Sequence, residues 1–172
     1  MEFSDYLPMF LAEARESLQN LNLALVRVEQ DPRDGETINE IFRIAHSLKG
    51  MSATMGFARM AALTHEMESV MEGLRGRSEP MEQTSLNALF QCLDTLESMT
   101  DEIEEEGAEQ TDPTSLIATL KAIRTGEVAQ AAVDDAAPVG PDADVAFETR
   151  ESLQARRARS EHLYGADVAV RA

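Results

Sequence analysis

Apolar residues recur along residues 1–126 at alternating steps of three and four, the spacing that places side chains on one face of a helix. The pattern is most regular near the amino terminus. Its members there are Leu7, Leu11, Ala14, Leu18, Leu21, Leu25 and Val28. Strand side chains alternate at every second residue, so this stripe predicts a long amphipathic helix and not a strand.

Two further stripes are separated by turn-forming residues. The second helix is predicted to begin at about Glu36, after the turn segment 31–35. Met55-Gly56-Phe57 then turns the chain into a third helix, which ends near Gly73 to Gly76, where glycine can adopt the left-handed cap conformation. The predicted inward-facing residues are Ile38, Ile41, Phe42, Ala45 and Ser52 in the second helix and Met60, Leu63, Met67, Val70, Met71 and Leu74 in the third.

A fourth stripe and a shorter fifth one complete the helical region. Thr84 or Ser85 is predicted to cap the fourth helix, which ends before Gly107. Asp112 followed by Pro113 is typical of a cap and a first-turn proline, and it predicts a fifth helix on the outside of the bundle. The predicted fold is all-α: an up-down four-helix bundle over residues 1–126 with a fifth, shorter C-terminal helix.

The helical pattern stops at about residue 127. Ala, Val, Asp, Pro and Gly predominate from there, without the spacing of an amphipathic helix. We interpret residues 127–172 as a flexible linker or disordered tail, truncated from a longer natural chain.

The net charge of the chain limits the classes of partner that it can bind. A formal net charge of −17 disfavours nucleic acid and anionic membranes, because binding to either requires clustered Lys and Arg. The single cysteine, Cys92, has no partner for an intramolecular disulfide and fits a reducing compartment. The amino terminus lacks the basic segment and apolar run of a signal peptide, so we expect a cytoplasmic protein.

The turn at Gly56 brings chemistry-bearing residues to one level. His46 lies ten residues before Gly56, and His65 and Glu68 lie nine and twelve residues after it. At about 1.5 Å per residue, all three lie roughly 15 Å from the turn on antiparallel helices. His46 and Glu68 each fall beside the apolar stripe of their helix, on the flank of the bundle.

This arrangement predicts a phosphorylatable histidine. Glu68 is expected to accept a hydrogen bond from Nδ1–H of His46, which leaves the Nε2 lone pair free as the nucleophile. Lys49 can direct its ammonium group towards phosphoryl oxygens. Gly50, four residues after His46, leaves a gap through which the surface of a partner can approach.

The sequence around these residues resembles the histidine phosphotransfer domain of CheA-type chemotaxis histidine kinases. The residues that carry the resemblance are Ala45-His46-Ser47-Leu48-Lys49-Gly50-Met51-Ser52-Ala53-Thr54-Met55-Gly56-Phe57 and Leu63-Thr64-His65-Glu66-Met67-Glu68. The resemblance implies that His46 is the phosphoacceptor, that Glu68 is its hydrogen-bonding partner, and that Lys49 and His65 are accessory residues. It also implies that a separate ATP-binding domain phosphorylates the histidine in trans within a dimer. The phosphoryl group would then pass to an aspartate of response regulators of the CheY and CheB type.

The chain contains no glycine-rich nucleotide box and no GxxxxGK[ST] motif. We therefore expect a substrate of a kinase and not a kinase, most simply the amino-terminal piece of a larger protein. No cofactor or metal is expected on this chain, because the kinase domain supplies ATP and Mg²⁺. We expect no membrane contact and a monomeric phosphotransfer domain.

Three alternatives remain at this point. The same bundle serves phosphorelays outside chemotaxis, and a helical adaptor would need no reactive histidine. A four-helix metal protein could gather His46, His65 and Glu68 around zinc or iron. Di-iron bundles, however, use two Glu-x-x-His pairs and two further inward carboxylates, whereas here a single pair occurs in the reverse order on the flank.

Overall fold

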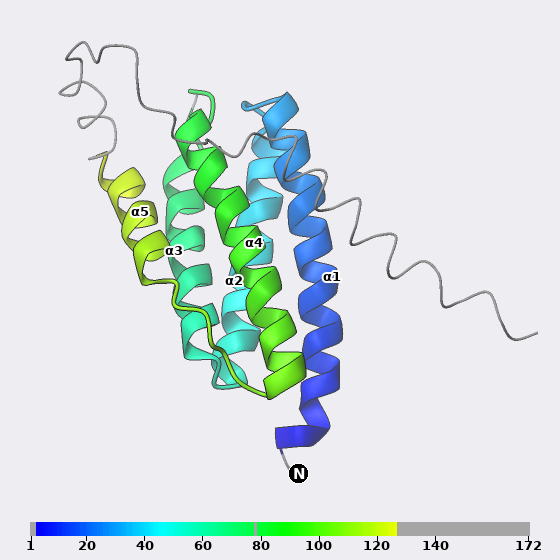
Figure 1. Ribbon diagram of the computed structural model, residues 1–172. Coiled ribbons are helices and arrows are strands. Elements are labelled where there is room, and N and C mark those ends of the chain that lie inside the picture. Colours follow the sequence, from blue (N-terminus) through cyan, green and yellow to red (C-terminus); the bar gives the residue numbers. More distant parts are fainter. Residues whose placement is uncertain (1–2, 78, 127–172) are drawn as a thin grey trace, which may run out of the picture. The chain divides into compact units, whose positions relative to one another are not determined.

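The computed structural model describes residues 3–77 and 79–126, which form five helices. Their bounds are α1 Phe3–Gln30, α2 Gly35–Thr54, α3 Ala58–Leu74, α4 Gln83–Glu106 and α5 Thr114–Thr125. Four long helices run side by side, and α5 lies beside α3 at one edge (Figure 1). The predicted all-α fold is confirmed for these ranges, and the predicted linker 127–172 lies outside the described residues. Within the same ranges, no helix has the length and apolar character needed to cross a membrane.

The core is built from the predicted stripes. Each long helix contributes large side chains that are fully buried, among them Leu21, Leu25, Ile41, Leu48, Met60, Leu63, Met67, Leu93 and Leu96. Burying one such side chain contributes about 1.5–3 kcal/mol, so this shared core is the main source of stability. Most charged residues of the described ranges lie on the outside of the bundle, where His46 is also found, whereas a few Ser and Thr side chains are buried.

The turn between α2 and α3 has the predicted position. Gly56 adopts a φ of +77°, a left-handed conformation that residues with a Cβ rarely adopt. The backbone N–H of Phe57 donates to the carbonyl of Ser52, 2.9 Å away. The ring of Phe57 is buried with its centroid 5.0 Å from that of Phe10, so the turn is packed against α1. The two helices that carry the candidate site therefore have a fixed register.

A carboxylate from a distant segment caps the start of α3. Phe57, at the cap position, makes no side-chain hydrogen bond. Instead, Glu109 accepts from the backbone N–H of Arg59 at 3.1 Å and from that of Met60 at 2.6 Å. The Arg59 guanidinium donates in return to the carbonyls of Gln110 and Thr111, at 2.7 and 3.2 Å. These contacts hold the connection between α4 and α5 against the first turn of α3.

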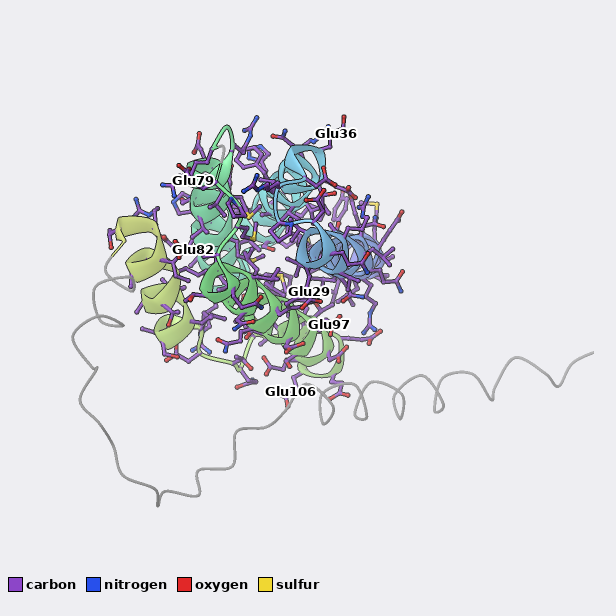
Figure 2. The ribbon with its side chains drawn as sticks, turned by 90° about the horizontal axis from the view of Figure 1, so that it is seen from above. Glu29, Glu36, Glu79, Glu82, Glu97 and Glu106 are labelled. Carbon is purple, nitrogen blue, oxygen red and sulfur yellow. The ribbon has the colours of Figure 1, made fainter. Side chains whose placement is uncertain are left out.

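The fifth helix packs on the outside of the bundle, as predicted. It contacts α3 and α4 and buries Leu120. Viewed along the helix axes, α5 lies outside the four long helices (Figure 2). Within the described residues, α5 contacts α3 and α4 but not α2. It therefore leaves the surface between α2 and α3 uncovered.

Two predicted helix starts were wrong. The helix α4 begins at Gln83 with Glu82 at the cap position and no side-chain cap, so neither Thr84 nor Ser85 caps it. Ser85 is buried in the first turn of α4, and the N–H of Met81 anchors the preceding connection by donating to the carbonyl oxygen of Pro32 at 2.9 Å. At the start of α5, Pro113 occupies the cap position and is not the first helical residue, although Asp112 Oδ1 accepts from the N–H of Thr114 at 3.0 Å, as a capping side chain does.

Candidate functional site

His46 stands on the outer side of α2 because its neighbours in the sequence fix the face of the helix. Ala45 and Leu48 are buried, so the two positions between them point outward, and the His46 side chain is 64% exposed. The helix begins at a cap in which Asp34 Oδ1 accepts from the N–H groups of Glu36 and Thr37, at 3.0 and 3.2 Å. Side-chain and backbone hydrogen bonds from Thr37 lower the pKa of Asp34, so this cap remains charged at neutral pH.

Glu68 reaches the same level from α3. Its Oε1 lies 2.6 Å from Nδ1 of His46, the hydrogen bond expected from the sequence. Its side chain is only 13% exposed, at a position of α3 close to the buried Met67 and Val70. The imidazole is therefore accessible to a partner while the carboxylate that holds it is shielded.

Lys49 also contacts this carboxylate. Its Nζ lies 2.5 Å from Glu68 Oε2, which makes an ion pair between the two helices. The Lys49 side chain is 30% exposed, so its ammonium group remains open to solvent on one side. Lys49 was expected to supply charge for a phosphoryl group. The structure adds that its ammonium group also balances the negative charge of the Glu68 carboxylate.

The charge state of Glu68 sets the tautomer of His46. Burial raises the pKa of the Glu68 carboxyl. The hydrogen bonds with Lys49 and His46, together with the charges of these two side chains, lower that pKa by more than burial raises it, so the pKa of Glu68 lies below its ordinary value. Glu68 is therefore a carboxylate at neutral pH and can only accept a hydrogen bond. Consequently, Nδ1 of His46 carries the hydrogen, and Nε2 of the neutral ring has the free lone pair.

His65 and Gly50 lie beside this contact and not within it. His65 is exposed and lines an open depression together with Lys49, Ala53, Gly56, Ala58, Ala61 and Ala62. In the described part of the chain, its ring takes no part in the hydrogen bond between His46 and Glu68. A Cβ built on Gly50 would have no atom within 4 Å, so the surface one turn after His46 is open. Across the described ranges, no three His, Cys, Asp or Glu residues are grouped so that they could hold a metal ion.

The structure adds an aromatic contact that sequence reasoning missed. Phe42 was predicted to face the core, but it is only half-buried and its ring stacks on that of His46, with centroids 6.3 Å apart and planes 19° apart. The spacing of four residues between Phe42 and His46 was the available signal, because residues i and i+4 are neighbours on a helix.

These observations define a class: a helical bundle that presents an exposed imidazole in contact with a carboxylate of the neighbouring helix. Comparison with known proteins agrees, since the sequence profile of the Hpt domain family matches residues 5–106. The chain belongs to the Hpt domain family, and within it the chain is similar to phosphotransfer domains of CheA.

Relatives define this similarity further. The chemotaxis protein CheA of Listeria monocytogenes is 40% identical over 120 residues, which are 70% of this chain and 19% of the relative. The CheA phosphotransferase domain from Thermotoga maritima is 39% identical, with a TM-score of 0.58 over 61% of this chain and 100% of that domain. A solution structure of the histidine phosphotransfer domain of CheA is 33% identical, with a TM-score of 0.65 over 83% of this chain and 98% of the other. The chain spans about a fifth of the length of the curated relatives it matches.

Proposed function

We propose that His46 is the phosphoacceptor of this CheA-type phosphotransfer domain. The observation that carries the proposal is the contact of an imidazole that is 64% exposed with a carboxylate that is 13% exposed, at 2.6 Å between Nδ1 and Oε1. The contact occupies Nδ1 and leaves Nε2 as the nucleophile. A nucleophile that must meet two different proteins in turn needs this combination of access and orientation.

The proposed reaction proceeds in two transfers. The Nε2 lone pair of His46 attacks the γ-phosphorus of ATP held by a kinase domain, the bond between phosphorus and the bridging oxygen breaks, and ADP leaves with the bonding electrons. The phosphorylated ring carries positive charge, which the Glu68 carboxylate stabilises through Nδ1–H. An aspartate oxygen of a response regulator then attacks the same phosphorus, and the electrons of the N–P bond return to Nε2.

Lys49 is proposed to assist both transfers. An ammonium group has three donors, so Lys49 can keep its contact with Glu68 while another N–H meets a phosphoryl oxygen. Gly50 is proposed to leave room for the partner, and His65 to assist from the rim of the depression. The kinase domain supplies ATP and Mg²⁺ for the first transfer, and the acidic pocket of the receiver supplies Mg²⁺ for the second, so the proposed site needs no metal of its own. We place the protein in the cytoplasm, where ATP and the receivers of this family occur.

The test mixes the full chain with a CheA-type catalytic core and radiolabelled ATP, and compares the wild type with His46→Gln. His65→Gln is the matched control, because it removes the other imidazole of the same flank. We expect acid-labile, base-stable label on the wild type and on His65→Gln, and none on His46→Gln. A chase with a CheY-type receiver should move the label to the receiver.

The result also separates the remaining alternatives. Label that persists in His46→Gln would refute the assignment of the acceptor. A folded chain that is never labelled by an active cognate core would favour a helical adaptor, for which His46→Gln changes no activity. Label that moves only to receivers outside chemotaxis would assign the domain to another phosphorelay.

A further inference from the structure

A second contact holds the His46 ring, on the side away from the turn. Phe42 precedes His46 by one helical turn, and the two ring planes are inclined by only 19°. Their centroids lie 6.3 Å apart, within the 4.5–7 Å range of favourable aromatic pairs. The Phe42 ring is half-buried and packs against the core, so it is itself a fixed surface.

Arg75 contacts Phe42 from the end of the neighbouring helix α3. It follows the last residue of α3, and its guanidinium carbon lies 4.3 Å from the centroid of the Phe42 ring, a cation–π contact. Its Nε donates to Oδ1 of Asn39 on α2, at 2.7 Å, which fixes the guanidinium over the ring. The sequence of contacts from Asn39 through Arg75 and Phe42 thus ends on the reactive histidine.

We infer that Phe42, supported by Arg75, is a positioning residue for the phosphoacceptor; the inference rests on the proposed role of His46. One hydrogen bond to Glu68 fixes the place of Nδ1 but still permits the ring plane to swing about that point. The stacked ring of Phe42 restricts this motion. Together the two contacts fix the direction of the Nε2 lone pair, on which in-line attack at phosphorus depends.

The decisive variant is Phe42→Leu, which keeps an apolar side chain and removes the stacked ring. The matched control is Phe90→Leu, because Phe90 is also a half-buried aromatic residue packed on the core, but on α4. Phe42→Tyr serves as the conservative variant that retains the ring. For the supporting cation, Arg75→Gln is compared with Arg75→Lys, and Arg77→Gln is the control at an exposed arginine of the same connection.

Two phosphodonors are used with the full chain: a CheA-type catalytic core with ATP, and the small molecule phosphoramidate. We expect Phe42→Leu to slow labelling about tenfold with both donors, since misplacing a reacting group by about 1 Å costs up to about 100-fold. Arg75→Gln should slow it about threefold, since an exposed cation–π contact is weaker. Phe42→Tyr, Arg75→Lys and the two controls should stay within about twofold of the wild type.

A spectroscopic measurement separates positioning from stability. The order parameter of the Cδ2–H bond of His46, measured by carbon relaxation, should fall in Phe42→Leu and remain unchanged in Phe90→Leu, even where both lower the melting temperature equally. Equal rates and equal order parameters for these two variants, with His46→Gln still unlabelled, would overturn the inference alone. A defect seen with the kinase core but not with phosphoramidate would also overturn it, because Phe42 would then be a docking residue. Labelling that does not depend on His46 would instead refute the proposed function.

Discussion

Replacing Glu68 by Gln tests the central claim about charge at the site. The substitution keeps the shape of the side chain but removes the charge that faces Nδ1 of His46 at 2.6 Å. A hydrogen bond to a charged group contributes about 1.5–3 kcal/mol, and a neutral one about 0.5–1.5 kcal/mol. The difference of about 1–1.5 kcal/mol acts on the imidazolium-like transition state and corresponds to about fivefold to thirteenfold slower phosphorylation. An amide that turns its NH₂ towards the ring would select the wrong tautomer and enlarge the defect.

The assay measures the initial rate of labelling at saturating concentrations of a CheA-type core and ATP. Glu72→Gln is the matched control, since it makes the same chemical change at an exposed position one turn further along α3. Thermal unfolding should differ little between the wild type and Glu68→Gln, because the imidazole of the pair is largely exposed. Nitrogen chemical shifts should show the Nδ1–H tautomer of neutral His46 in the wild type. A Glu68→Gln rate within twofold of the Glu72→Gln rate would refute the reasoning.

Three further predictions concern the bundle that holds the site. Gly56→Ala should lower the free energy of unfolding, measured in urea, by about 1–2 kcal/mol, because the φ of Gly56 is +77°. Gly50 lies inside a helix, so Gly50→Ala should raise the free energy of unfolding by about 0.5–1 kcal/mol. The added methyl group should nevertheless slow transfer to a receiver, because it fills open surface near His46. An unchanged transfer rate would remove the access role of Gly50. Glu109→Gln should lower the melting temperature, since it weakens the cap of α3, and an unchanged temperature would contradict this role. Burial raises the pKa of Glu102, but hydrogen bonds from Thr111 and Gln110 lower it by more, so the pKa in the folded protein lies below the ordinary value of 4.5. The Glu102 carboxylate therefore stabilises the fold fully above pH 4.5, and this stabilisation is lost as the pH falls through the folded pKa. The stability difference between wild type and Glu102→Gln should therefore vanish in acid, and a difference that persists there would contradict the assignment.

The level of the site could be predicted by counting residues from a turn. The left-handed Gly56 and the regular rise of two helices place His46 and Glu68 side by side, whatever the details of packing. The contact of Lys49 with Glu68 could not be predicted in this way. A long side chain with several rotatable bonds can reach either a carboxylate or solvent, and only the packed neighbours decide which.

Contacts between segments that are distant in the sequence could not be predicted either. Glu109 caps α3 from about fifty residues away, and no local pattern announces it. Arg75 belongs to a connection read as a helix end, and its position over Phe42 depends on how α3 crosses α2. The predicted caps of α4 were wrong for the same reason. The N–H of Met81 donates a hydrogen bond to the carbonyl oxygen of the distant Pro32, which fixes the chain just before that helix.

Stability and reactivity are separated in this bundle. The buried faces of α2 and α3 determine whether the chain folds, whereas the contact of His46 with Glu68 lies at a wet flank, where an ion pair contributes only about 0–1 kcal/mol to folding. The same contact matters more for transfer, because it acts on charge that develops only when the ring attacks phosphorus. Selection for phosphotransfer can therefore change Glu68 or Lys49 with little cost to the fold, whereas Phe42 also packs against the core. A screen that reads only melting temperature would miss Glu68 and Lys49, and a screen that reads labelling rate would find them.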